Sequence, residues 1–266
     1  VYAEELVISG NGSESANAVT LSQNTNVNVN QNNTASVENN INVTANTGNN
    51  TTNDNNGDSA IATGDISVSE NITNTLNGSS VNYDNCCGGE GQISISGNGS
   101  GSNNSATHNG SGSININANN YASVTNIVKG HALSGNNAAN DNNGNVAIKT
   151  GDIRVKEKII TNANLSFIKV TSPLSKDYIL NISGNGSDST NTIIDNTTND
   201  IVIAVNNNAH IFNNSFWDLI TGNNEASDNS GDVTIETGDI EFASVIENNV
   251  NASEVVVTCC KDEKPE

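Results

Sequence analysis

The sequence predicts an all-β protein of three tandem repeats, arranged as a β-solenoid or, as the alternative, as three β-sandwich domains in tandem. The tetrapeptide Thr-Gly-Asp-Ile begins at Thr63, Thr150 and Thr237, a step of 87 residues each time. Apolar and polar residues alternate over long stretches, which is the period-2 pattern of a half-buried strand. Apolar residues do not recur at helical spacing, so we predict no helices.

The 87-residue step also holds for other landmarks, with no insertion or deletion between them. The sequence Ile-Ser-Gly-Asn-Gly, for example, begins at Ile8, Ile95 and Ile182. A fixed period indicates an array of equivalent structural units, and a strict register indicates that the length of the unit matters, as it does when units stack. We therefore divide the chain into repeat 1 (1–91), repeat 2 (92–178) and repeat 3 (179–266), and we expect the three to superpose.

Within each repeat, the alternation predicts about eight short strands separated by turns. Residues 25–30 (Thr-Asn-Val-Asn-Val-Asn) alternate, and so do residues 65–72, together with their counterparts in the other repeats. Clusters of Gly, Asn and Asp are expected to end the strands about every 6–12 residues. They include the turn dipeptides Asn11–Gly12, Asn56–Gly57, Asn77–Gly78 and Asn143–Gly144. Strands this short and this numerous would give about four solenoid turns per repeat.

The alternation also predicts which side chains face the interior. We expect Val27, Ile114 and Ile201 to point inward. We expect the neighbouring asparagines to point outward or to form ladders, namely Asn26, Asn28 and Asn115. The inward candidates of repeat 1 include no aromatic residue, whereas a sandwich core needs bulky side chains from two sheets. A thin solenoid core suits small β-branched residues, and stacked Asn side chains can hydrogen bond between turns.

One segment resembles a known group of proteins. Residues 47–77 (TGNNTTNDNNGDSAIATGDISVSENITNTLN) are similar to the Asn-rich, TGD-containing repeats of predicted surface proteins from uncultivated Patescibacteria. Residues 41–50 (INVTANTGNN) also resemble the strand–Gly-Asn–strand pattern of curli-type amyloid repeats. The first resemblance extends over all three repeats. It implies export and a role at the cell surface or in an appendage, and it implies no known chemistry.

The composition restricts the function classes. The chain has a net charge of −20, with 14% charged and 3% aromatic residues. Such a composition is typical of disorder, but periodic placement of the apolar residues argues for a folded chain. The acidic balance argues against binding to nucleic acid. No run of 18 apolar residues is present, so we predict no membrane span. The chain lacks Met and begins Val-Tyr-Ala-Glu-Glu-Leu, which fits the position after a removed secretion signal.

Cysteines occur as two adjacent pairs, Cys86–Cys87 and Cys259–Cys260. The pairs lie at matching repeat ends, since 86 plus twice 87 is 260. Their spacing does not match that of zinc sites. Because an exported protein keeps its disulfides, we predict that all four are oxidised, with a free or metal-bound thiol cluster as the alternative. Adjacent cysteines bond each other only through a strained ring, and the pairs would lie two units apart in an elongated array, so we expect at least one bond between chains.

Basic residues cluster in the second repeat. Residues 129–176 contain seven Lys or Arg side chains and three acidic ones, whereas no Lys or Arg precedes Lys129. Within this stretch we take four residues as a candidate subunit contact for an acidic neighbour, namely Lys149, Arg154, Lys156 and Lys158. The alternative interpretation is a solvated basic strand face.

The sequence contains no recognisable catalytic or cofactor-binding motif. His108, His131 and His210 occupy different positions within their repeats, whereas a repeated active site would repeat its histidines. Residues 54–58 and 228–232 resemble calcium loops, since clustered oxygen ligands suit that ion, but Asx turns explain the same residues. We therefore predict that the protein is not an enzyme and has no cofactor, with calcium as a possible ligand.

The sequence thus favours a structural function. We expect a secreted subunit of an extracellular filament or pilus-like fibre that assembles head to tail with copies of itself. A solenoid that stays monomeric needs atypical terminal repeats as caps, and here the first and third repeats are as regular as the second. The alternative is a monomeric cell-surface adhesin or a ligand- or ice-binding solenoid.

Overall fold

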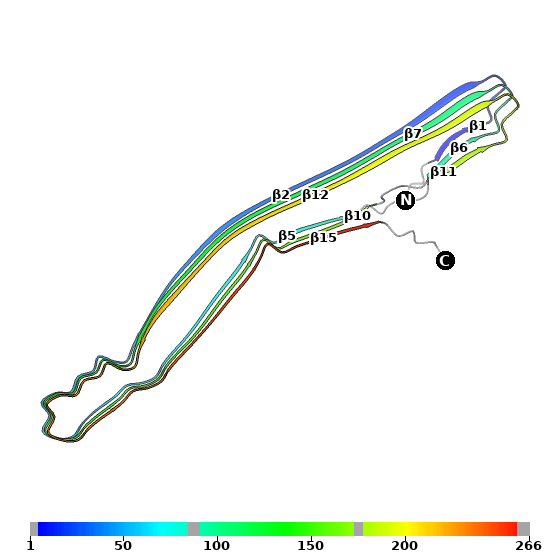
Figure 1. The fold of residues 1–266 in the computed structure, drawn as a ribbon. Coiled ribbons are helices and arrows are strands. Elements are labelled where there is room, and N and C mark those ends of the chain that lie inside the picture. The colour runs from blue at the N-terminus through cyan, green and yellow to red at the C-terminus, as the bar shows by residue number, and fades with distance from the viewer. Residues whose placement is uncertain (1–4, 85–90, 173–177, 260–266) are drawn as a thin grey trace, which may run out of the picture.

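The computed structural model describes residues 5–84, 91–172 and 178–259, and these contain strands but no helix. Each repeat forms one rung of a β-solenoid, and the three rungs stack on one another (Figure 1). The prediction of an all-β solenoid of three repeats is confirmed.

The described part of each rung contains five strands. Rung 1 has β1 (Glu5–Ser9), β2 (Ala16–Asn46), β3 (Ser59–Ala62), β4 (Ile66–Leu76) and β5 (Ser79–Asp84). Rung 2 has β6 (Gly91–Ser96), β7 (Asn103–Leu133), β8 (Val146–Lys149), β9 (Ile153–Ala163) and β10 (Ser166–Ser172). Rung 3 has β11 (Tyr178–Ser183), β12 (Thr190–Ile220), β13 (Val233–Glu236), β14 (Ile240–Val250) and β15 (Ser253–Cys259).

The rung is a flattened loop with two layers. The 31-residue strands β2, β7 and β12 form the long-strand layer, and the other four strands of each rung run along its opposite side as the short-strand layer (Figure 1). Apolar side chains fill the space between the layers. Ile114 and Ile116 of β7, for example, pack in one cluster with Ile168 of β10. At about 3.3 Å per residue, a 31-residue strand is about 100 Å long.

All strand pairing occurs between rungs, and it is parallel and in register. The five sheets have the orders β1-β6-β11, β12-β7-β2, β13-β8-β3, β14-β9-β4 and β15-β10-β5. Each residue of these strands therefore forms a column with its counterparts one repeat away, as in Ile66↔Ile153 and Ile153↔Ile240. The predicted superposition of the repeats is confirmed. An insertion of one residue into a rung would turn its inward side chains outward, which explains the strict 87-residue step.

Two predictions about the unit are wrong. Each repeat has five strands, not about eight, and it makes one solenoid turn, not four. Clusters of Asn do not end the strands as expected, since β2 continues through Asn30 to Asn33 without interruption. The sandwich alternative is also excluded, because a sandwich pairs strands within a repeat, and here they pair only between repeats.

The predicted inward positions are confirmed. Ile114 is buried, and Val27 and Ile201 pack against it from the neighbouring rungs. Asn26 and Asn28 are exposed on the outer face of β2. Their counterparts on β7 are partly covered, because the middle rung has a neighbour on each side.

Asparagine ladders form part of the interior. In seven columns the side-chain amide nitrogen of one rung donates to the Oδ1 of the next, always in the direction from rung 1 to rung 3, over 2.7–3.0 Å. The middle members are all buried. Because a buried amide is costly unless it is hydrogen bonded, the ladder makes Asn acceptable in the core. The seven rung 1 members are Asn11, Asn17, Asn33, Asn39, Asn50, Asn55 and Asn77.

The turns stack in the same way. Asn49, Asn136 and Asn223 form one column with φ values of 62°, 62° and 59°, and Asp54, Asp141 and Asp228 form another with 59°, 58° and 54°. Asn and Asp tolerate this left-handed conformation better than other residues with a Cβ. The predicted turn dipeptides all lie between strands.

Candidate assembly surfaces

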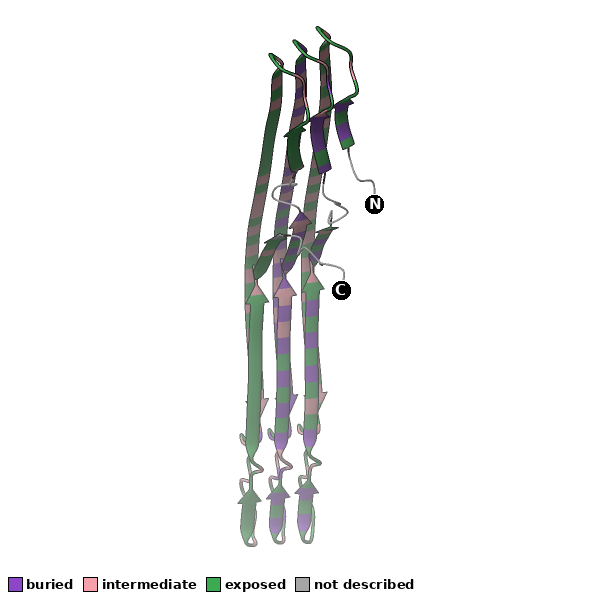
Figure 2. Ribbon diagram, turned by 90° about the vertical axis from the view of Figure 1, so that its right-hand side faces the viewer, coloured by how far each residue is buried: buried purple, intermediate pink, exposed green. Residues whose placement is uncertain are grey.

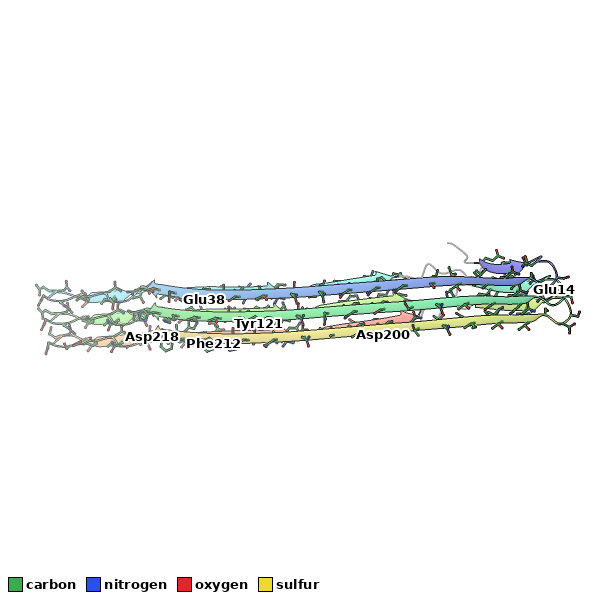
Figure 3. All side chains as sticks on the ribbon, turned by 90° about the horizontal axis from the view of Figure 1, so that it is seen from above. Glu14, Glu38, Tyr121, Asp200, Phe212 and Asp218 are labelled. Carbon is green, nitrogen blue, oxygen red and sulfur yellow. The ribbon has the colours of Figure 1, made fainter. Side chains whose placement is uncertain are left out.

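The stack has two open edges, one on each side. Among the described residues, the strands β1–β5 of rung 1 and β11–β15 of rung 3 pair on one side only, as the outermost positions of β2 and β12 show (Figure 3). We call these the rung 1 edge and the rung 3 edge. Proteins usually protect an edge strand with Lys, Pro or a short length. None of the ten edge strands contains Lys, Arg or Pro, and β2 and β12 have 31 residues each. Both edges therefore present long rows of backbone groups that another chain can pair with.

The two layers are offset by about half a rung. Asn33 of β2 donates to the Ser79 hydroxyl of β5 over 2.8 Å, and that hydroxyl donates to Oδ1 of Asn120, in β7, over 2.9 Å. One rung further, Ser166 contacts both Asn120 and Asn207. Each residue in this part of the short-strand layer thus lies between two successive long strands. Asn74 is placed in the same way, between Asn39 and Asn126.

Because of this offset, the short-strand layer extends beyond β12 at the rung 3 edge. Ile66, Ile153 and Ile240 occupy one inward column, yet they are 6%, 0% and 46% exposed. The short strands of rung 3 are accordingly coloured as exposed in Figure 2, whereas those of the other rungs contain buried positions. We call the apolar strip formed by six such residues the overhang: Leu180, Ile182, Ile235, Ile240, Ile246 and Val255.

Glycines at turns mark a second property of the edges. A Cβ added to Gly135 would overlap the carbonyl oxygen of Gly222 in rung 3, and one added to Gly151 would overlap the backbone of Gly64 in rung 1. At Gly222 and Gly64 themselves, an added Cβ would meet nothing within 4 Å, and neither residue has a φ in the left-handed region. Neither conformation nor contact within the chain requires glycine at these two edge positions.

Both edges are acidic. In rungs 1 and 3 the described residues contain no Lys or Arg. Asp65, Asp152 and Asp239 form a column in which Oδ1 of one Asp accepts the backbone N–H of the next over 2.9 Å. In the column of Asp58 and Asp232, Asn145 makes the equivalent hydrogen bonds. These contacts join successive rungs, and both calcium binding and the Asx turns remain predictions. The described residues include no group of three His, Cys, Asp or Glu side chains suited to a metal ion.

The four basic candidates for a subunit contact lie in β8 and β9 of the middle rung or beside them, away from both edges. Lys149 forms an ion pair with Glu236 over 3.0 Å, and this hydrogen-bonded carboxylate raises the pKa of Lys149. Arg154 contacts Asp152 over 2.8 Å and Glu241 over 3.5 Å. All four side chains are exposed on the outer face of the short-strand layer. A subunit contact through them would therefore be lateral, and it remains a prediction.

The cysteine prediction falls mostly outside the described residues. Cys86, Cys87 and Cys260 are not among them, and Cys259 is described only as the backbone end of β15. One premise of the prediction is nevertheless wrong. Asp84 and Thr258 share a column with Thr171, so the repeats stack rather than follow one another end to end. The ends of repeats 1 and 3 are thus only two strand spacings apart, about 10 Å.

Two of the three histidines bridge rungs 2 and 3. His108 is buried and its Nδ1 lies 2.7 Å from Oδ1 of Asp195, and the exposed His131 lies 3.1 Å from Asp218. The contacts join counterparts of a single column, which is a structural arrangement.

A buried acidic cluster was missed by the sequence analysis. Glu157 is 2% exposed and its Oε2 accepts hydrogen bonds from Ser215 (2.6 Å) and Trp217 (2.8 Å). Glu70, its neighbour in the column, is 9% exposed, and its Oε2 has no hydrogen-bond partner. Burial, and then the charge of Glu157, raise the pKa of Glu70. The signal in the sequence was the column of Val43, Gly130 and Trp217, in which the indole occupies the space over a glycine.

The fold and its edges define a class, a parallel, in-register β-solenoid that is open at both ends. No family model, no curated protein and no solved structure matches the chain. The described residues contain no helix long and apolar enough to cross a membrane.

Proposed function

We propose that this protein is the structural subunit of an extracellular filament, in which copies associate through their rung edges. The observation that carries the proposal is the pair of open edges, ten strands without a single Lys, Arg or Pro. An unprotected edge strand is a template for pairing with another chain, and two such edges on one molecule permit growth in both directions.

The parallel pairing favours head-to-tail growth. The rung 1 edge and the rung 3 edge are different surfaces, so a contact between them does not close on itself and extends into a filament. The filament axis would run perpendicular to the strands. Each copy would add three strand spacings, about 14 Å, to a body about 100 Å wide.

We propose that disulfides then link successive copies. Asp84 is the last described residue before Cys86, and Thr258 adjoins Cys259. The two residues lie two strand spacings apart within one chain. If copies stack with the same spacing, the two positions lie one step apart across the junction. A disulfide spans Cα atoms up to about 7 Å apart, which accommodates one step of about 4.8 Å but not two. Cysteines at these ends therefore favour bonds between copies, and a disulfide-linked filament suits the oxidising exterior of the cell.

Electron microscopy and fibre diffraction of the purified chain test the proposal. We expect unbranched filaments with a reflection at about 4.8 Å along the filament axis, the strand spacing of stacked rungs. Electrophoresis without reductant should give a ladder of covalent multimers that collapses to monomer when reductant is added. A chain that stays dispersed at every ionic strength and concentration would refute the filament.

A further inference from the structure

We propose that successive copies meet in an overlap joint, in which rung 1 of one copy continues the stack of rung 3 of the preceding copy in the same 87-residue register. This inference rests on the proposed function and specifies its interface. Four features of the two edges carry it, namely the overhang, a chain of polar contacts, the direction of the Asn ladders and the edge glycines.

The overhang consists of inward residues that lack the packing partner their counterparts have in the other rungs. Inside the chain, Ile72 of the short-strand layer packs with Val128, which belongs to the long strand of the following rung. Ile246 is the counterpart of Ile72 in rung 3, where no following rung exists, and it is 45% exposed. In a continued stack, β2 of the next copy takes the place of that rung and brings Ile41, the counterpart of Val128, over Ile246. The occupant that fits the overhang is therefore a second copy of this chain.

Polar contacts end in complementary groups. The contacts Asn33–Ser79–Asn120–Ser166–Asn207–Ser253 zigzag between the layers and stop at Ser253, which accepts a hydrogen bond from Asn207 over 2.7 Å. Each earlier serine in the series also contacts the Asn of the following rung. The next member after Ser253 would be Asn33 of the adjoining copy, whose Oδ1 accepts no hydrogen bond from the described residues.

The Asn ladders give the joint its polarity. All seven buried ladders point from rung 1 to rung 3, so in these columns the rung 1 edge ends in Oδ1 acceptors and the rung 3 edge ends in amide donors. The exposed Asn ladders of the outer face point the opposite way, and they too match only when unlike edges meet. Joining the rung 3 edge of one copy to the rung 1 edge of another pairs donors with acceptors in every column. Joining two identical edges would place donors against donors or acceptors against acceptors.

The edge glycines fit a continued stack. Within the chain, Gly48 and Gly135 need to be glycine because the next rung lies where a Cβ would be. Gly222 is the third member of that column, and only a further rung would impose the same need on it. Gly64 stands in the mirror situation on the rung 1 edge, below Gly151 and Gly238. Two positions on opposite edges are thus suited to a neighbour that the single chain does not contain.

Substituting alanine for the edge glycines tests the joint. In the Gly222→Ala chain, the added Cβ meets nothing within the chain but would overlap the next copy at the rung 3 edge, and Gly64→Ala acts likewise at the rung 1 edge. We expect each variant alone to melt at or slightly above the wild-type temperature and to remain monomeric by light scattering. An equimolar mixture should form heterodimers, because the unmodified rung 3 edge of the Gly64→Ala chain fits the unmodified rung 1 edge of the Gly222→Ala chain.

Two further variants keep the test decisive. Gly78→Ala is the matched control, since its Cβ is also free in the chain but its column contains Leu165 and Ala252, so filaments should form as in wild type. Ile246→Lys blocks the overhang at a side chain that is already 45% exposed, and it should behave like Gly222→Ala even if the glycine variant folds poorly.

The outcomes separate the joint from the filament. Normal filaments from Gly222→Ala, Gly64→Ala and Ile246→Lys would overturn the overlap joint and leave the filament standing. Dimers from either glycine variant alone that persist when Lys156 and Lys158 are replaced with Glu would show that identical edges pair, which also overturns the joint. If the wild-type chain forms no filaments, the proposed function itself fails.

Discussion

At the scale of the residue, asparagine occupies buried positions that apolar side chains usually fill in a core. Asn126 is fully buried, and it accepts a hydrogen bond from Asn39 and donates one to Asn213, both over 2.7 Å. A ladder of this kind satisfies each amide only because the identical residue lies one strand spacing above and below. The interior can therefore be thin and polar while the amides of its seven buried ladders are hydrogen bonded.

Asn126→Ala should destabilise the chain strongly. The change removes one hydrogen bond from each of three groups, the amides of Asn39 and Asn74 and the carbonyl oxygen of Asn213, although Asn39 still donates to Asn74. Leaving a buried polar group unsatisfied costs about 1–3 kcal/mol. Chemical denaturation measures the free energy of unfolding. The matched control is Asn119→Ala, which breaks an exposed ladder with Asn32 and Asn206 on the outer face and should cost less than about 0.5 kcal/mol. Equal losses for the two variants would contradict a structural role for the buried ladders.

The stacked carboxylates of Glu70 and Glu157 make stability depend on pH. Glu70 has a pKa raised above its ordinary value of 4.5, first by burial and then by the charge of Glu157, the one charged group that raises it. The folded chain therefore holds a proton on Glu70 over a pH range in which the unfolded chain has lost it. Within that range, above about 4.5, stability falls as the pH rises.

Glu70→Gln should remove this dependence. At neutral pH we expect the variant to melt at a higher temperature than wild type, because a neutral amide replaces a buried charge, and the gap should narrow as the pH approaches 4.5. Thermal melts across this pH range provide the measurement. Glu38→Gln, at an exposed position on β2, serves as the control and should leave the pH profile unchanged. A wild-type melting temperature that rises through this range would refute the account.

At the scale of the element, alternation was sufficient to assign the inner faces, but it did not give the length of the strands. Asn is unfavourable in an isolated strand, so clusters such as Asn30–Asn33 appeared to be breaks. They continue the strand because the ladder partner is 87 residues away, a contact that no local pattern contains. The half-rung offset of the layers could not be predicted from the sequence either, since it depends on how Ser79 and Asn74 fit between two long strands.

The candidate surfaces could be predicted from the sequence only in part, because they depend on contacts between repeats. The regular first and third repeats indicated that the ends are open, since this regularity is already present in the sequence. The overhang and the edge glycines became visible only when the columns and the direction of each Cβ were known. Glu157 escaped notice because its hydrogen bonds come from Ser215 and Trp217, which belong to another repeat and another layer.

The register of β7 can be tested by one substitution. Ile114→Asn places an amide at an inward position that is 6% exposed and has no ladder partner, because Val27 and Ile201 flank it. We expect a loss of roughly 2–5 kcal/mol in the free energy of unfolding, by analogy with large-to-small core changes. Asn115→Ser on the outer face is the control, with an expected change within about 0.5 kcal/mol. A near-zero effect of Ile114→Asn would mean that the inward register of β7 is wrong.

At the scale of the whole molecule, the chain is a thin plate. Its long strands extend for about 100 Å, while three stacked rungs measure only about 14 Å. Among the described residues, no rung follows rung 3 to cover its offset short-strand layer, which is why inward residues such as Ile240 remain 46% exposed. Most protein domains bury their apolar surface in all three dimensions. This molecule leaves burial incomplete in one dimension, and stacking of copies is the arrangement that would complete it.

The basic stretch predicts a second, lateral mode of association. Lys156 and Lys158 are exposed on the outer face of the short-strand layer, in an otherwise acidic molecule. Replacing both with Glu should leave the melting temperature of the monomer nearly unchanged and should hinder assembly, most strongly at low salt, where exposed charges are least screened. Turbidity and electron microscopy measure the assembly, and Lys129→Glu on the opposite layer is the control. Normal assembly of the double variant would support the alternative interpretation, in which this stretch is a solvated strand face.

The acidic edges predict that elongation depends on salt. An overlap joint places carboxylates of like charge one strand spacing apart in four columns, pairing Glu14, Asp54, Asp58 and Asp65 of one copy with Asp188, Asp228, Asp232 and Asp239 of the other. At about 4.8 Å, each repulsion is close to 1 kcal/mol in water. Salt screens exposed charges with a Debye length of about 10 Å at 0.1 M, so the critical concentration for assembly should fall as NaCl is added. Sedimentation of filaments across a salt series measures it.

Neutralising one side of the joint should weaken that salt dependence. The Asp58→Asn, Asp65→Asn double variant retains its side-chain acceptors, because Asn145 already accepts the backbone N–H of Asp232 in the column of Asp58. It should assemble at a lower critical concentration than wild type at low salt and converge with it at high salt, where screening already suppresses the repulsion. The matched control is Glu38→Gln, since Glu38 would face Phe212 across the joint and has no acidic counterpart there. If the critical concentration rises with salt even when Lys156 and Lys158 are replaced with Glu to remove the lateral contact, the copies do not meet through their acidic edges.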